Sequence, residues 1–522
     1  MQTDGTRYSI LALAPFDPNP ALDDRGTPLE VTRETLDEKA AALNIRYCLP
    51  LDTNLCPSGG IELAIDGIKA LQPDSMLQKN GYLKRLLEAG AFVDRARKDS
   101  QTVDQIADGL RRWPDLPKVA LPITPNHKTV EHSDSSRDAI DQILQMVAMP
   151  APPGRSPIAG NPLQDMPAQI LNALLRRPDF RRMEAAWRGL RLLLSQGAVS
   201  DSVRVAIAPL RPESPIEGLH RLSPRLQADP PSLIIVDWSF DNTPLSIERL
   251  RALSQWADAL MVPVLAWVSP AFLQIDSWEE LTALSYLPHH LDTAAYAKYR
   301  TLRQAPESRW LSLTCNRFLV RYPYGPENPP RRISMQEPTP LWIAPVWGLA
   351  TLVAQSVCHT GWPTRFTEGA RFQLHDLAAA NSTRTPPIVT EFSPDADRRA
   401  QLLKIGLSPL STEAGRDRAF CNEAVTLAGS SLKHQLMIGQ VSQFIRWCRE
   451  HLPVDRTPAD LQFQLKLAFQ VFSERSRPAG LAEVRVDAQT PDEAGCLPVR
   501  VLITPTMEVL PGEDPIELQL NW

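Results

Sequence analysis

Two places in this sequence suggest catalytic chemistry. One is the carboxylate of Asp237, and the other is the thiol of Cys358 beside the imidazole of His359. Asp237 stands near the end of the apolar run SLIIVDW, and open parallel sheets carry their sites at the carboxyl ends of their strands. A lone carboxylate at such a place is also a common helix cap or surface group. Cys358 and His359 look like a nucleophile and its base, but adjacent residues on a helix point about 100° apart, which favours a structural thiol.

Motifs that assemble catalytic or metal sites are missing from the sequence. It contains no HExxH, GxSxG, GxGxxG or Walker loop, and no cysteine and histidine pairs at zinc-finger spacing. We therefore expect no catalytic residues, no cofactor and no metal. An α/β enzyme with its site near Asp237 stays open as an alternative.

The overall charge argues against a polyanion as partner. The 522 residues carry 55 Lys and Arg against 60 Asp and Glu, a net charge of -5, so we expect no binding of nucleic acid. No window approaches the roughly 18 uninterrupted apolar residues of a membrane span, and the opening MQTDGTRYSI lacks the pattern of an export signal. Seven cysteines without a CxxC fit reduced thiols. The sequence predicts a cytoplasmic protein without membrane insertion.

The clearest single element is a helix within residues 176–194. Its apolar residues recur every three or four positions, which marks one buried stripe: Phe180, Met183, Trp187, Leu190 and Leu194. The other face carries four cations: Arg181, Arg182, Arg188 and Arg191. Because Glu184 can pair with its arginine neighbours, we expect this face to meet solvent or another protein and not phosphate.

The surrounding pattern predicts a mixed α/β (α+β) fold. Two apolar runs, 232–238 and 262–269, flank an amphipathic helix, and such a βαβ unit implies a parallel sheet. Ahead of them, YSILALAPF is typical of a buried strand, which we place with IELAI in a small α/β unit ending near Trp113. Near the C-terminus AEVRVD, LPVRVLIT and PIELQL predict antiparallel strands.

The helix at 178–190 begins with PDF and has the core EAAWRGL, and LIIVDWSF, VPVLAW and SPAFLQIDSWEEL follow it in order. The segment 295–330, ending in FLVRYPYGPENPP, and the helix region WIAPVWGLATLVAQSVCHTGWP come next. In this order the stretches resemble the large subunit of the type VI secretion contractile sheath (TssC, also called VipB). The resemblance extends over about 165–522.

The first 113 residues are more faintly similar to the small sheath subunit (TssB, or VipA), through a strand with a PF-D turn and the stretch LDDR. The resemblance implies a natural fusion with four parts: a small-subunit-like domain at 1–113, a Pro-rich linker at 114–164, a large-subunit-like domain at 165–395, and a helical and antiparallel-strand part at 396–522.

The resemblance also implies the function. Sheath subunits stack around an inner tube and contract, so we expect a non-enzymatic bacterial protein that contacts other sheath subunits, the tube protein and the baseplate. A short helix in the linker is similar to the element that the AAA+ unfoldase of the ClpV type binds, through Ile140, Ile143, Leu144 and Val147.

Subunit contacts are expected at two places. The first is the arginine face described above, and the second is the terminal strand, through Ile516, Leu518 and Leu520, because family sheaths exchange terminal strands. Only seven residues precede Tyr8, so an exchanging N-terminal strand is not evident. A cap, terminator or baseplate adaptor that does not polymerise therefore stays open as an alternative.

Overall fold

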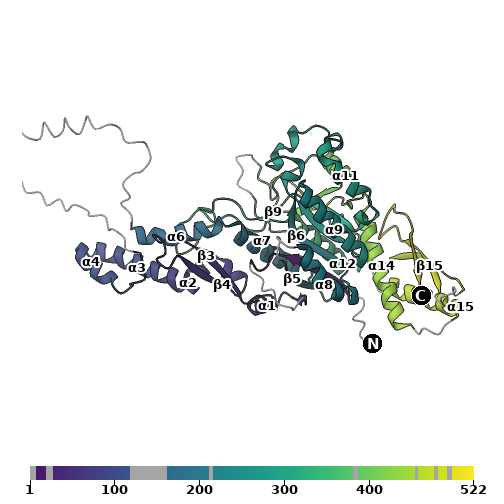
Figure 1. Cartoon of the computed structure of the whole chain (residues 1–522), viewed down its shortest axis with the longest axis horizontal. Coiled ribbons are helices and arrows are strands. Elements are labelled where there is room, and N and C mark those ends of the chain that lie inside the picture. The colour runs from purple at the N-terminus through teal and green to yellow at the C-terminus, as the bar shows by residue number, and fades with distance from the viewer. Residues whose placement is uncertain are drawn as a thin grey trace, which may run out of the picture.

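The computed structural model describes residues 7–18, 27–117, 161–210, 215–379, 386–452, 457–474, 480–490 and 497–522. Its helices and strands form the mixed α/β fold that the sequence predicts. Figure 1 shows an elongated arrangement with a helical unit around α3 and α4 at one end, a large sheet in the middle and a C-terminal unit around α15 at the other end.

A seven-stranded sheet forms the centre of the chain, in the order β11-β8-β7-β6-β1-β5-β2. Its strands are β1 (Tyr8–Ala14), β2 (Leu29–Glu30), β5 (Val203–Pro209), β6 (Leu233–Phe240), β7 (Val264–Val268), β8 (Leu311–Cys315) and β11 (Leu407–Pro409). All neighbours are parallel except the edge pair β2 and β5. The expected βαβ unit is confirmed as β6, α9 (Pro244–Leu260) and β7.

The first strand lies in this large sheet and not in the small N-terminal unit where we expected it. Ile10 of β1 pairs in register with Val205 of β5 on one side and with Leu233 of β6 on the other. The N-terminal segment therefore completes the sheet of the following region. At the other end of the chain, β11 pairs with β8, so residues just after the expected boundary at 395 also belong to this sheet. The four ranges themselves stay a prediction.

Both faces of the sheet are buried, which explains the nearly continuous apolar runs of its strands. Side chains of a strand alternate between faces, so Ile10 and Ala12 of β1 join one core while Leu11 and Leu13 join the other. The first core includes α7 (Pro178–Leu192) and α12 (Pro345–Thr360), and the second includes α8 (Pro215–Ala228) and α9.

Helix α7 has the orientation that its periodicity predicts. All five residues of its apolar stripe are buried. Gly189 of this helix lies against α12, where a Cβ atom would come within 2.4 Å of the Trp347 ring. The close approach of the two helices therefore requires glycine at this position.

The N-terminal unit consists of an antiparallel hairpin and helices. Its elements are α1 (Leu36–Ala42), β3 (Ile45–Pro50), β4 (Gly60–Ile65), α2 (Pro73–Lys79), α3 (Gly81–Lys98), α4 (Val103–Leu110) and α6 (Pro162–Leu175). Asn161 at the start of α6 donates from its side chain to the Gly90 carbonyl of α3 at 2.8 Å. This unit shares the first core with the sheet.

The C-terminal unit has a core of its own. The predicted strands are confirmed as the antiparallel sheet β14-β15-β16, and two long helices accompany them. Their bounds are α14 (Leu432–His451), α15 (Pro458–Glu474), β14 (Leu481–Ala488), β15 (Pro498–Pro505) and β16 (Ile516–Asn521). Trp362, from the turn after α12, joins this core and connects the unit to the rest of the chain.

Shorter elements complete the described part. They are α10 (Leu287–His290), α11 (Ala297–Gln304), β9 (Phe318–Leu319), β10 (Trp342–Ile343), α13 (Ala396–Lys404), β12 (Ser411–Thr412) and β13 (Ala419–Phe420). Among the residues described, no helix has the length and apolar character needed to cross a membrane. The expected unfoldase-binding residues Ile140, Ile143, Leu144 and Val147 lie outside the described residues.

Candidate interaction surfaces

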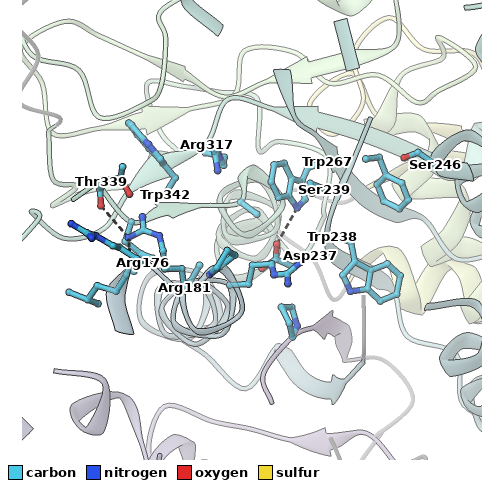
Figure 2. A pocket seen from close by; sticks show the side chains of 18 of the residues that line it. Arg176, Arg181, Asp237, Trp238, Ser239, Ser246, Trp267, Arg317, Thr339 and Trp342 are labelled. Atoms are coloured by element: carbon cyan, nitrogen blue, oxygen red, sulfur yellow. Dashed lines mark hydrogen bonds between the residues drawn. The ribbon is translucent and has the colours of Figure 1, made fainter. Parts of the chain in front are cut away.

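Asp237 lies within β6, three residues before the strand ends at Phe240, and not at the end of the strand as expected; two tryptophans occupy its carboxylate. Trp267 of β7 donates its indole N–H to Oδ1 at 3.1 Å, and Trp347 of α12 donates to Oδ2 at 2.7 Å. Figure 2 shows Trp267 above the carboxylate. Burial raises the pKa of Asp237 to about 6, and the two indole hydrogen bonds lower it against that trend. This carboxylate therefore holds β6, β7 and α12 together.

A cavity of about 910 Å³ opens beside Asp237. Its wall includes residues at the carboxyl ends of β1, β6 and β7, where the chain order of the sheet reverses around β1. Open α/β sheets bind ligands in such crevices. Asp237 is the sole carboxylate among the described lining residues, which include five arginines: Arg176, Arg181, Arg182, Arg249 and Arg317. No group of three or more potential metal ligands occurs among the described residues.

Two of the four predicted contact arginines are used inside the chain. Arg188 donates to the buried Glu184 at 2.7 Å, and Arg321 donates to the same oxygen at 3.1 Å. Arg321 also forms a bidentate pair with the buried Glu337, at 2.6 and 2.9 Å. Arg181 completes this cluster by pairing with Glu337 at 3.3 Å and donating to the Pro340 carbonyl.

The cluster of Arg181, Glu184, Arg188, Arg321 and Glu337 connects α7 to the segment after β9. Burial alone would raise the pKa of Glu184, but the charges of Arg321 and Arg188 and their hydrogen bonds outweigh it. The pKa therefore lies below its usual value. Sequence spacing indicated the pair of Glu184 with Arg188, but it gave no signal for the two more distant partners.

The other two predicted contact arginines, Arg182 and Arg191, are exposed on α7. Their exposure leaves them accessible to another molecule, and Arg182 also lines the cavity. The role of the arginine face in subunit contacts stays a prediction, now centred on these two residues.

The terminal strand β16 is at an edge of its sheet. It pairs with β15 on one side only, and β14 forms the opposite edge. Ile516 is buried, while Leu518 and Leu520 are half-buried against the C-terminal core. An edge strand presents unpaired backbone N–H and C=O groups, so either edge can accept a further strand.

An exposed apolar stripe on α15 is a feature that the sequence analysis missed. Phe463, Leu467 and Val471 recur every four residues and are 69%, 50% and 45% exposed. The opposite stripe of this helix, through Leu465 and Phe469, fills the C-terminal core. Because α15 is apolar on both faces, one of its stripes lacks a partner within the described chain, and such a patch is typical of an interaction site.

Cys358 and His359 on α12 do not contact each other as nucleophile and base. The Cys358 thiol donates to the Gly197 carbonyl at 3.3 Å and accepts from the Ser200 hydroxyl at 3.2 Å. The His359 ring packs near Phe372, with 6.0 Å between ring centres. The thiol therefore has the structural role that the sequence favours.

Comparisons with known proteins relate this geometry to sheath proteins. Residues 226–428, which include β6 to β8 and α12, match the family model VipB (EvpB/VC_A0108, tail sheath N-terminal domain). The type VI secretion system sheath protein TssC1 of Pseudomonas aeruginosa is 23% identical over 334 residues. That match covers 55% of this chain and 66% of the relative, so the chain spans slightly less than two thirds of the relative's length.

Solved structures with partial similarity include a sheath tail protein and a chain from a baseplate. A sheath tail protein from Desulfitobacterium hafniense has a TM-score of 0.35 at 6% identity, over 59% of each chain. A chain of the anti-feeding prophage baseplate has a TM-score of 0.38 at 11% identity, over 62% of this chain and 77% of that chain. By sequence, residues 226–428 match the model of a tail sheath domain, and over about half of its length the chain is similar to a type VI secretion system sheath protein.

Proposed function

We propose that this chain is a structural subunit of a type VI contractile sheath, which assembles with other sheath subunits around an inner tube and contracts. The single observation that carries the proposal is the match of residues 226–428 to the tail sheath domain. The role is structural and not enzymatic, and the carboxylate of the enzyme alternative, Asp237, already serves to hold two tryptophans. The extended assembly then stores energy in switchable subunit interfaces, and contraction releases it as they reach a better-packed state.

The finer part of the proposal is that the chain fuses a small-subunit-like region to the large subunit. In support, β1 lies between β5 and β6, and β6 falls inside the matched sheath domain. A strand from the N-terminal region therefore completes the sheath sheet within one polypeptide. Fusion fixes the ratio of the two parts at one to one and removes the entropic cost of their association.

Two surfaces of the C-terminal unit support self-association. The open edges of β14 and β16 offer backbone hydrogen bonds to a neighbouring strand, and the apolar stripe of α15 offers about three large side chains for burial. Each surface can contact a neighbouring subunit.

Proposed partners beyond the sheath itself are the inner tube protein, the baseplate and an AAA+ unfoldase of the ClpV type. The unfoldase contact would use residues 140–147. Changing Ile143 and Leu144 to Ser should abolish unfoldase binding in a pull-down assay while the melting temperature of the full chain stays unchanged. Unchanged binding would remove this partner.

Negative-stain electron microscopy of the purified full chain tests the proposal. A sheath subunit should form long tubes, alone or with the tube protein added. Soluble monomers or single rings under both conditions would contradict the proposal and favour a cap, terminator or baseplate adaptor. A bound metabolite recovered from the purified protein, with no assemblies, would instead return attention to an enzyme.

A further inference from the structure

Five arginines line the cavity beside Asp237, and described carboxylates do not pair with all of them. Of its five arginines, Arg181 pairs with Glu337 and Arg317 pairs with Glu391 at 2.6 Å. The guanidinium groups of Arg176 and Arg182 have no ion-pair or hydrogen-bond partner within the part of the chain that the structure describes. Asp237 forms no ion pair with them among the described residues, and both of its oxygens accept indole hydrogen bonds. The cavity therefore favours an anionic ligand.

The remaining wall is aromatic and offers further donors. Trp238, Trp267 and Trp342 line the cavity, and Figure 2 shows Arg176 and Arg181 on the side away from Trp238. Trp238 is 7% exposed, and its buried indole N–H lacks a hydrogen-bond partner among the described residues. Tryptophan and arginine are the side chains that dominate the centres of protein interfaces. The lining thus suits a protein segment with carboxylates and an apolar anchor.

One segment of the chain has this complementary chemistry. Residues 501–522 contain Glu508, Glu513, Asp514 and Glu517 and no Lys, Arg or His. Glu508 and Asp514 are exposed, and Met507 beside them is 71% exposed. Glu517 pairs with Arg500, but no ion pair involves the other three carboxylates within the described residues. A flexible methionine packs well on aromatic rings.

We propose that the acidic segment 506–518 of one copy docks into the arginine cavity of a second copy. In Figure 1 the C-terminal unit lies beyond α14, at the opposite side of the sheet region from α6 and α7, and α7 contributes Arg181 and Arg182 to the cavity. The contact joins two different surfaces of the same chain. Such head-to-tail contacts generate rings or open helical assemblies. The inference rests on the proposed function and gives it a defined contact.

A peptide titration tests the inference. The probe is a fluorescein-labelled peptide of residues 506–518, TMEVLPGEDPIEL, added to the full chain while fluorescence anisotropy is recorded. Arg176→Glu and Arg182→Glu should each weaken binding by at least about tenfold, because like charges then face each other. Arg251→Glu is the matched control, since Arg251 is an exposed arginine on α9 that lies outside the cavity. It should leave binding unchanged.

A charge swap separates a specific site from general attraction. A peptide with Lys at positions 513 and 514 should bind the doubly substituted Arg176→Glu and Arg182→Glu chain better than the natural peptide does. No binding of the natural peptide to the unsubstituted chain, or equal loss in all three single variants, overturns the inference. Tubes that form without peptide binding would refute this contact and leave the sheath proposal standing. Arginine-dependent peptide binding without assemblies would support this contact and contradict the sheath proposal.

Discussion

Arg321→Met tests whether the buried ion-pair cluster stabilises the junction of α7 with the segment after β9. Arg321 is the cation shared by Glu184 and Glu337, whose side chains are fully buried. Removing one partner of a buried pair typically costs about 3–5 kcal/mol, because the remaining charge is left uncompensated. Glu184 keeps Arg188, and Glu337 keeps Arg181, so we expect the lower end, about 3 kcal/mol.

The matched control is Arg221→Met. Arg221 pairs with Glu217 at 3.9 Å on the surface of α8, and both side chains are at least half exposed. Exposed pairs contribute less than about 1 kcal/mol, so this variant should unfold almost like the unsubstituted chain. Adding Glu337→Gln to Arg321→Met should recover part of the loss, because it removes one of the stranded charges.

Urea unfolding, followed by near-ultraviolet circular dichroism, measures these differences. Because the chain has more than one core, hydrogen exchange resolved to peptides of α7 should accompany it, since local opening of that helix reports on the cluster directly. A loss of less than about 1 kcal/mol in the free energy of unfolding for Arg321→Met would refute the reasoning. So would hydrogen exchange in α7 that is as fast in Arg221→Met as in Arg321→Met.

Three further outcomes follow from the geometry. Since the pKa of Asp237 is raised to about 6 from about 4 in the unfolded chain, its ionisation should cost the folded state up to about 3 kcal/mol between pH 4 and 7.5. Asp237→Asn should therefore lower the free energy of unfolding at pH 4 and lower it clearly less at pH 7.5. An equal loss at both pH values in urea unfolding would contradict this expectation. The pKa of Glu184 is lowered, so Glu184→Gln should reduce the free energy of unfolding by its full amount at pH 7. This loss should shrink below about pH 4 as the carboxylate protonates. A loss that stays constant with pH would contradict the expectation. The double variant Phe463→Ser with Leu467→Ser should reduce the pelleting of assemblies without lowering the melting temperature. Leu465→Ser, in the core, should lower the melting temperature. Normal pelleting of the double variant would exclude the α15 stripe as an assembly contact.

Local patterns predicted the type of most elements but not their distant partners. The periodicity of α7 identified its buried stripe, because helix geometry fixes which residues share a face. The apolar run of β1 indicated a buried strand, yet it carries no information on pairing with β5, almost 200 residues later. We therefore placed β1 in the wrong unit.

The candidate surfaces show the same division. The pair of Glu184 with Arg188 follows from helical spacing, whereas Arg321 and Glu337 come from another part of the fold. The apolar residues of α15 form two stripes, and sequence alone does not tell which one the C-terminal sheet covers. In the cavity, the strand that carries Asp237 was predictable, but Trp347, a hydrogen-bond partner 110 residues away, was not.

The proposed function requires contacts between copies of this chain. Cross-linking of an equal mixture of ¹⁴N-labelled and ¹⁵N-labelled full chain, analysed by mass spectrometry, detects such contacts. We expect mixed-isotope cross-links that join α15, β14 or the region of β16 in one copy to another copy. Cross-links confined to single-isotope pairs, at protein concentrations up to those used for microscopy, would contradict it.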